Sequence, residues 1–356
     1  MANDPRDIDG KRLKNALYML GRNAALRGRL LEFLKIAEAD LKIDGSVRDE
    51  ITGPIVDALH DEQDIYEKTL SDGTRFKFLF RTKIARDFLM ATDEHPSHVW
   101  EPQTTKLLMG LTTAIQGDVI VGGAYFGDQA VLVAKNIKSA GRYIHCFEPN
   151  LAQAGMLKEN FKLNELNNVR FNTLGLWSES SVRLKLDGFD SFANAIKAEA
   201  DEDGFETISI DDYQSQFSLK IGLIQLDIEG AELGTLRGAS RTINQFKPHI
   251  VFEVHRDYVD WSEGLENTEL CKLLLDTGYS VFAIRDFNSH YEMANKPVEL
   301  VPVDKVYLEG PPHGFNMVAV QNASVFSRPL YKIVENVSPK LLLHKDPALH
   351  HPTDGL

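Results

Sequence analysis

Two segments of the chain place acidic or imidazole side chains directly after short apolar runs. Residues 226–232 read Leu-Asp-Ile-Glu-Gly-Ala-Glu, and residues 252–255 read Phe-Glu-Val-His. Carboxylate and imidazole groups are the usual general acids and bases of enzymes. Asp227, Glu253 and His255 are therefore the candidates for proton transfer, with His255 preferred because it is neutral at pH 7 and can take a proton.

The acids of residues 226–232 do not all need a catalytic explanation. Glu229 and Glu232 stand at the start of the following helix, where the helix dipole stabilises negative charge. Asp227 lies on the strand side, where no capping role accounts for it. A single histidine at a strand end is more often structural, and that alternative stays open for His255.

A glycine-rich turn and a following acid point to a nucleoside. The turn, Val-Gly-Gly-Ala-Tyr-Phe-Gly-Asp at residues 121–128, lets a ligand approach the backbone, although its glycine spacing differs from the dinucleotide-binding pattern. Glu148, in Phe-Glu-Pro at the end of the next apolar run, is placed to accept hydrogen bonds from ribose hydroxyls. Packing alone also explains such glycines. The candidate cofactor-binding residues are Gly122, Gly123, Ala124, Tyr125, Gly127, Glu148 and Asp227.

Short apolar runs alternate with amphipathic stretches from Gly117 onward, which predicts a parallel sheet with helices on both faces. We expect strands at 119–121, 143–147, 169–174, 223–226, 250–254, 280–284 and 317–320, and helices at 127–138 and 152–163. Since carboxyl ends of parallel strands meet at one edge, the acids above should lie together.

The remaining segments are assigned by their patterns of apolar, turn-forming and proline residues. Residues 1–100 are predicted to be an N-terminal, mainly helical region with a hairpin around Ser71-Asp72-Gly73-Thr74, and its apolar stripe must pack on the next domain or on a second copy. Residues 101–325 form the sheet domain. Its insertion, 175–222, is a candidate substrate lid with Trp177, Phe189 and Phe192 on the substrate wall, although these aromatics could equally be packing residues. Residues 326–356, with four prolines, read as a loosely packed tail.

Composition limits the partners. The net charge is −13, with 39 basic and 52 acidic residues, which disfavours nucleic acid and anionic membranes. Two cysteines are too few for a disulfide framework or a zinc ribbon. No signal peptide or apolar run of bilayer length is recognisable. We expect a cytoplasmic protein that acts on a small molecule. No spacing of possible metal ligands in the sequence requires a metal ion. If the N-terminal apolar stripe pairs with a second copy, the protein is a homo-oligomer.

The ordered set of motifs, from the glycine-rich turn through Phe-Glu-Pro to the two acidic strand ends, resembles the FkbM-type methyltransferases. The resemblance covers about residues 101–320, and 226–232 is its most specific part. It implies S-adenosyl-L-methionine (SAM) as cofactor and a seven-stranded Rossmann-like sheet whose last strand is antiparallel. It also implies O-methylation of a sugar or natural product, with Gly123 and Gly127 shaping the methionine pocket, Glu148 holding the ribose and Asp227 near the reacting centre. Glu229 is a further substrate candidate.

One departure keeps other functions open. The family turn usually begins with an acid, where this chain has Val121. A non-catalytic nucleotide-binding scaffold is therefore an alternative, although a scaffold has no need for so many acids at one rim. An NAD-dependent oxidoreductase is a weaker alternative because of the glycine spacing. A divalent ion bridging the carboxylates to a diol is a further option for the mechanism.

Overall fold

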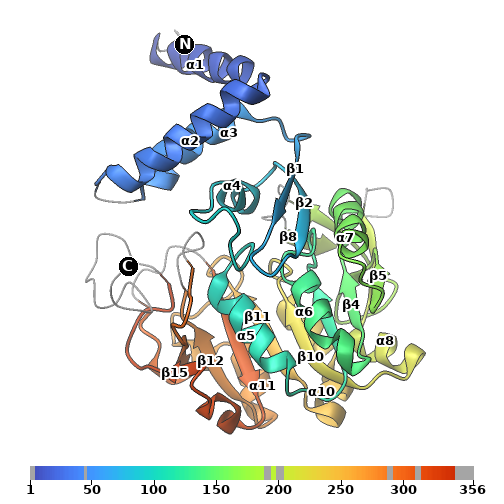
Figure 1. Cartoon of the computed structure of the whole chain (residues 1–356). Helices are drawn as coiled ribbons and strands as arrows, with labels where there is room; N and C mark the ends of the chain where they lie inside the picture. The colour runs from blue at the N-terminus through green and yellow to red at the C-terminus, as the bar shows by residue number, and fades with distance from the viewer. Residues whose placement is uncertain are drawn as a thin grey trace.

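A computed structural model describes residues 5–43, 46–187, 194–197, 204–286, 292–308 and 314–340. Within these ranges a nine-stranded mixed sheet forms the centre of the molecule (Figure 1). Its order is β15 (Tyr331–Ile333), β13 (Val298–Pro302), β12 (Ser280–Ile284), β14 (Phe315–Val320), β11 (His249–Val254), β10 (Ile221–Leu226), β3 (Asp118–Gly122), β4 (Ile144–Phe147) and β5 (Val169–Asn172).

Helices cover both faces of this sheet, as the sequence predicts. Val119 and Val121 pack with α5 (Pro102–Thr112), α6 (Ala130–Ile137) and α7 (Leu151–Leu163). Ile120 points to the other face, because neighbouring strand residues alternate between faces. That face carries α8 (Ile210–Phe217), α9 (Glu232–Arg237), α10 (Ser240–Phe246) and α11 (Glu269–Asp276). No helix in the described ranges is both long and apolar enough to cross a membrane.

The sheet has two strands more than the seven expected. Strands β12, β14, β11, β10, β3, β4 and β5 correspond to those seven, and β14 is antiparallel to both of its neighbours. Strand β13 then pairs with β12, and β15 pairs with β13. The sequence analysis did not predict β13, because Glu299 interrupts its apolar residues. Glu299 is nonetheless buried, and its charge is paired with Arg285 Nη1 at 2.8 Å.

The predicted C-terminal tail is packed over its first part. β15 lies inside it, Tyr331 is buried, and Ser338 has no exposed surface. The expectation of a loose tail from residue 326 is therefore wrong as far as residue 340. Backbone groups of this segment find partners in the sheet domain; for example, Pro339 O accepts the N–H of Asp286 at 2.8 Å.

The N-terminal region consists of α1 (Pro5–Gly21), α2 (Ala24–Asp40), a π-helical turn at Arg48–Thr52, α3 (Gly53–Leu59), the hairpin β1 (Ile65–Thr69) and β2 (Arg75–Leu79), and α4 (Lys83–Leu89). The hairpin is confirmed. α1 and α2 project away from the sheet domain, so their apolar stripe is not buried on it (Figure 1). Leu34 is buried, whereas Leu13 and Phe33 remain more than half exposed.

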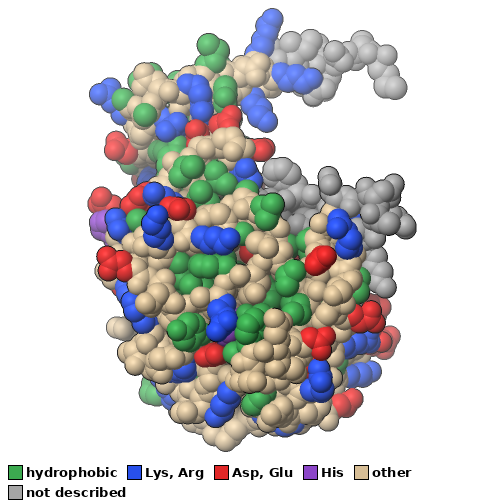
Figure 2. All heavy atoms as spheres, turned by 90° about the vertical axis from the view of Figure 1, so that its right-hand side faces the viewer, with side chains coloured by type: hydrophobic (Ala, Val, Ile, Leu, Met, Phe, Trp, Pro, Cys, Tyr) green, Lys and Arg blue, Asp and Glu red, His purple; other side chains and the backbone are tan. Residues whose placement is uncertain are grey.

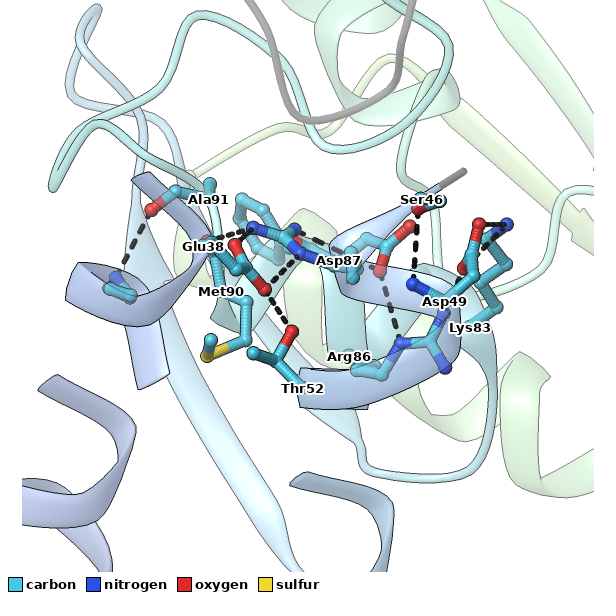
Figure 3. A network of polar contacts seen from close by, with 12 residues as sticks. Glu38, Ser46, Asp49, Thr52, Lys83, Arg86, Asp87, Met90 and Ala91 are labelled. Carbon is cyan, nitrogen blue, oxygen red and sulfur yellow. Dashed lines mark hydrogen bonds and ion pairs between the residues drawn. The ribbon is translucent and has the colours of Figure 1, made fainter. Parts of the chain in front are cut away.

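Within the N-terminal region, a network of ion pairs joins α2 and the π-helical turn to α4 (Figure 3). Arg48, which is 3% exposed, binds Glu38 of α2 with both Nε and Nη2 and donates to the carbonyl of Met90 at 2.8 Å. Glu38 also accepts the hydroxyl of Thr52. Arg86 of α4 donates to Asp49 at 2.9 Å. Because Arg48 is buried between α2 and α4, this network fixes the base of the projecting helices.

The hairpin is attached to α7 by two asparagine side chains. Asn160 accepts the N–H of Lys77 at 2.7 Å and donates to its carbonyl at 2.8 Å, and Asn164 binds both backbone groups of Arg75 in the same way. Asn160 also donates to Phe126 O at 2.8 Å, in the glycine-rich turn. Backbone hydrogen-bonding groups on the outer edge of β2 are thus paired with side chains from the α7 segment of the sheet domain.

The insertion forms a small sheet of its own, in the order β6 (Gly175–Leu176), β9 (Phe205–Ile208), β7 (Arg183–Asp187) and β8 (Asn194–Lys197). Strands β7 and β9 coincide, within two residues, with segments of alternating apolar and polar residues at 182–186 and 207–210. Phe189 and Phe192 lie outside the described residues, so the lid hypothesis stays a prediction.

Candidate active site

The glycine-rich turn touches the strand end that carries Asp227. Asp227 N–H donates to Gly122 O at 3.1 Å, and a Cβ on Gly123 would lie 1.8 Å from Asp227 O. Gly123 also has a φ of +72°, which side-chain-bearing residues rarely adopt. Glycine at position 123 is therefore required to bring Asp227 beside the turn.

We expect Gly123→Ala to destabilise the protein by about 2–4 kcal/mol, because a strained φ adds to an overlap with backbone that cannot move away. Gly141→Ala is the matched control: Gly141 has a φ of +67° but open space around its Cβ position. It should cost only about 1 kcal/mol, the penalty of the left-handed conformation. Urea unfolding measures both, and equal losses would show that the approach of Asp227 is not what requires Gly123.

Not all residues of the turn can meet a ligand. Gly122, Ala124 and Gly127 are buried, whereas Gly123 and Tyr125 keep accessible surface. A Cβ on Gly127 would lie 2.9 Å from Leu157 of α7, so this glycine serves helix packing. Gly122, Ala124 and Gly127 can therefore act on a cofactor only through the shape of the backbone.

Glu148 shapes the turn with both carboxylate oxygens. Its Oε2 accepts the N–H of Tyr125 at 2.8 Å, and its Oε1 accepts the N–H of Asn150 at 2.8 Å. Tyr125 has a φ of +48°, and its hydroxyl lies 2.9 Å from Thr82 Oγ1. Each carboxylate oxygen has a second lone pair. Glu148 can therefore hold the turn and still accept hydrogen bonds from ribose hydroxyls.

The predicted acids come together. Carboxylate oxygens of Asp227, Glu229 and Glu253 lie within 4.8 Å of one another. Burial raises the pKa of Asp227 to about 6, although its side chain is accessible to solvent. The pKa of Glu229 rises to about 8 through burial and the charge of Asp227, and the same two causes raise that of Glu253 well above its ordinary value. Asp227 thus loses its proton at a lower pH than Glu229.

Two further acids, which the sequence analysis did not assign to the site, surround these three. Glu101, at the start of α5 with a φ of +44°, accepts Asn316 Nδ2 at 2.7 Å; burial and Asp227 raise its pKa to about 8. Burial and Asp227 also raise the pKa of Asp128 to about 7. We call Glu101, Asp128, Asp227, Glu229 and Glu253 the acidic cluster.

Glu232 lies in the first turn of α9, as its position predicts, but its side chain binds the turn that precedes the helix. Its carboxylate accepts the N–H of Ile228 at 2.9 Å and that of Gly230 at 3.0 Å. Glu229 is different, because it has a φ of +50° and accepts the hydroxyl of Tyr258 at 3.3 Å. Strained residues at such positions are typical of functional sites.

His255 and Trp177 are occupied by local contacts. His255 Nδ1 accepts the N–H of Asp257 at 3.1 Å and also lies 3.5 Å from Asp257 Oδ2. Trp177 packs flat against α9, where a Cβ on Gly234 would lie 2.8 Å from the indole ring.

The sequence predicts no metal site from ligand spacing, but the structure brings three carboxylates together. Asp227, Glu229 and Glu253 each offer an oxygen to a shared position. Oxygen ligands of this kind suit hard divalent cations. This set is therefore able to hold such an ion.

Comparisons with known proteins agree with the motifs. Residues 122–281 match the sequence profile of the methyltransferase FkbM domain. No curated protein matches the chain. Among solved structures, the methyltransferase FkbM of Methylobacillus flagellatus KT is 14% identical with a TM-score of 0.35, and the match covers 57% of this chain and 43% of that one. A SAM-dependent methyltransferase of Agrobacterium tumefaciens is 12% identical with a TM-score of 0.39, over 74% and 72% of the two chains. Over residues 122–281 the chain is thus similar to the methyltransferase FkbM domain.

Proposed function

We propose that the protein is a SAM-dependent O-methyltransferase that acts on a hydroxyl group of a sugar or natural product. The observation that carries the proposal is the position of Asp227, which is accessible, surrounded by four other acids and adjacent to Gly123. A carboxylate with a pKa of about 6 is ionised at neutral pH and still basic enough to accept a proton.

The residues around Asp227 fit the cofactor. Gly123 keeps accessible surface, and Glu148, which holds the turn at Tyr125, is the proposed acceptor for ribose hydroxyls. The acidic cluster complements a ligand end that carries a sulfonium and an ammonium group. When bound, SAM supplies an electrophilic methyl group, so the chain itself needs only to align the acceptor, exclude water and remove a proton.

Asp227 is the proton acceptor in this proposal, in place of His255. His255 is the weaker candidate because its Nδ1 is engaged with the backbone N–H and the carboxylate of Asp257. The pKa of Glu229 is raised to about 8, so Glu229 keeps its proton at neutral pH, and burial and Asp227 raise the pKa of Glu253 well above its ordinary value. The protonated carboxyl group of Glu229 can donate a hydrogen bond, and so can orient the acceptor hydroxyl toward Asp227.

The test uses SAM with a deuterated methyl group and a panel of polyhydroxylated acceptors, including free sugars, glycosides and macrolides. Mass spectrometry should find a trideuteromethyl ether in at least one acceptor. Thermal stabilisation by SAM but not by NAD would exclude the oxidoreductase. SAM binding without transfer to any acceptor would favour the non-catalytic scaffold, which Val121 leaves open. A cytoplasmic location remains part of the proposal.

We also propose a homo-oligomer that covers the exposed stripe of α1 and α2. Leu13, Met19 and Phe33 are 62%, 74% and 61% exposed, and apolar surface of this extent is unfavourable in water. Figure 2 shows hydrophobic and basic side chains interspersed on these helices. The proposal assigns the stripe to a second copy because the structure leaves it clear of the sheet domain.

Sedimentation measurements should find the wild type larger than a monomer, and Met19→Glu combined with Phe33→Glu should return it to a monomer. A charge buried in an apolar contact without a partner is strongly unfavourable. Leu151→Glu is the control, since Leu151 is 75% exposed on α7, away from the stripe. A monomeric wild type, or an equal effect of the control, would refute the oligomer.

A further inference from the structure

The N-terminal region contacts the glycine-rich turn at two successive aromatic residues. Phe126 lies among the phenylalanines of the hairpin, and its ring centre is 6.3 Å from that of Phe76 and 6.1 Å from that of Phe78, both in β2. Tyr125 directs its hydroxyl group to Thr82, whose Oγ1 is 2.9 Å away. The turn therefore packs directly against the N-terminal region, with one polar contact and two aromatic ones.

Thr82 stands where a threonine normally caps a helix. It directly precedes α4, its backbone is extended, with a φ of −132°, and its carbonyl oxygen accepts the N–H of Arg86 at 3.1 Å. Threonine is favoured at this position because its hydroxyl oxygen usually accepts an N–H group of the first helical turn. Among the described residues of α4, however, none donates its N–H to the Thr82 side chain. Helix capping therefore does not explain this hydroxyl group, which binds Tyr125 instead.

Tyr125 depends on such contacts because its backbone is strained. Its φ of +48° lies in the left-handed region, which is unfavourable for a residue with a side chain. A residue keeps such a conformation only where the surrounding structure holds it. Two polar contacts do so at the two ends of Tyr125: its N–H donates to Glu148 Oε2 at 2.8 Å, and its hydroxyl group binds Thr82. Loss of the hydroxyl contact would leave the strain less opposed.

The same N–H group links Tyr125 to the proposed ribose acceptor. The carboxylate of Glu148 is oriented by one backbone N–H on each oxygen, that of Tyr125 on Oε2 and that of Asn150 on Oε1, both at 2.8 Å. If the backbone of Tyr125 relaxed toward a negative φ, its N–H would turn away from Oε2, and the carboxylate could rotate. The direction in which Glu148 faces a ribose therefore depends on the conformation of Tyr125.

Thr82 is itself held in place through α4. At the other end of this helix, Arg48 donates to Met90 O at 2.8 Å, and within it Arg86 donates to Asp49 at 2.9 Å (Figure 3). These contacts fix α4 to the remainder of the N-terminal region. Thr82 is thus a fixed point against which the side chain of Tyr125 is positioned.

We propose that Thr82 is a positioning residue of the cofactor site, which holds Tyr125 in its strained conformation so that Glu148 faces the ribose of SAM. The inference rests on the proposed function, because that function gives the turn SAM as its ligand. It also extends the cofactor site beyond residues 122–281, the part of the chain that matches the methyltransferase domain. A contact that only joined two parts of the fold would stabilise the protein without changing its affinity for SAM.

The experiment measures SAM binding by titration calorimetry at pH 7.5 for the wild type, Thr82→Val, Tyr125→Phe and the double variant. Valine and phenylalanine keep the shapes of threonine and tyrosine, and each removes one hydroxyl group of the pair. Each single variant should bind SAM about 3- to 10-fold more weakly, which corresponds to the net contribution of one neutral hydrogen bond. Because both changes break the same bond, the double variant should lose no more affinity than a single one.

Two further variants show whether the hydroxyl group itself is responsible. Thr82→Ser keeps this group and should retain the wild-type affinity. Thr277→Val is the matched control: Thr277 is also partly buried, but its hydroxyl group donates to Leu273 O and Leu274 O of α11, on the other face of the sheet. Its affinity for SAM should equal that of the wild type.

The unfolding midpoint of each variant separates positioning from a purely structural contact. Lower midpoints with unchanged SAM affinity in Thr82→Val and Tyr125→Phe would overturn the inference. Losses of affinity that multiply in the double variant, or an equal loss in Thr277→Val, would overturn it as well. If Thr82→Val does not fold, Tyr125→Phe tests the same hydrogen bond from its other side.

The wild type distinguishes this inference from the proposed function. A wild type that binds no SAM would refute the proposed function and, with it, the role of Thr82. A wild type that binds SAM no more tightly than Thr82→Val and Tyr125→Phe would refute the role of Thr82 alone.

Discussion

Asp227→Asn should slow methyl transfer by about 10²- to 10⁴-fold, the range typical for loss of a positioned base. Asparagine keeps the shape of the side chain but cannot accept the proton. In the wild type, turnover should rise with pH and be half-maximal near pH 6, where Asp227 ionises. In Asp227→Asn this rise should be lost. Single-turnover transfer from labelled SAM, measured against pH with the acceptor found by the screen, gives both quantities.

His255→Ala is the control for this experiment, since the imidazole ends a neighbouring strand but its Nδ1 is occupied by the N–H of Asp257. The variant should keep both the rise of turnover with pH near pH 6 and most of the wild-type turnover. The reverse result, in which the rise of turnover with pH is kept in Asp227→Asn and lost in His255→Ala, would assign the role of base to the histidine.

Replacing Glu148 by Ala should weaken SAM binding by about 10²- to 10⁴-fold. Two ribose hydroxyls lose a charged acceptor, at about 1.5–3 kcal/mol for each bond, and every 1.4 kcal/mol is a factor of ten in affinity. The N–H groups of Tyr125 and Asn150 also lose their partner, so the turn itself loosens. Titration calorimetry at pH 7.5 measures the change directly.

Glu159→Ala supplies the comparison, because Glu159 is an exposed acid on α7 and its loss changes the net charge equally. Glu148→Gln keeps one carbonyl acceptor and should fall between the wild type and Glu148→Ala. If Glu148→Ala does not fold, Glu148→Gln still tests the acceptor role. The unfolding midpoint of each variant shows whether it is folded. Unchanged SAM affinity in a folded Glu148→Ala protein would remove Glu148 from the cofactor site.

The sequence predicted the parts of the site that follow from sheet geometry. Asp227 and Glu253 end adjacent parallel strands, β10 and β11, and carboxyl ends of such strands meet at one edge. The glycine-rich turn was found because Gly123 needs a conformation and a close approach that other residues resist. Both inferences depend on local sequence and on a general rule of topology.

The other parts depend on contacts between distant segments. Glu101 precedes Pro102 at the start of a helix, where an acid is already explained by the helix dipole. The sequence cannot show the hydrogen bond that occupies His255, because it is decided by the turn that follows β11.

The asparagine contacts between α7 and the hairpin have a consequence for synthesis of the chain on the ribosome. Strand β2 emerges early, but the residues that complete its outer edge, Asn160 and Asn164, come 83 and 89 residues later. An open strand edge is a template for pairing with other chains. Until α7 has been translated and has folded against it, the hairpin of the nascent chain is exposed to misassembly, and native contacts this distant in sequence form slowly. Asn160 therefore couples the maturation of the N-terminal region to that of the glycine-rich turn, since the same side chain binds Lys77 and Phe126.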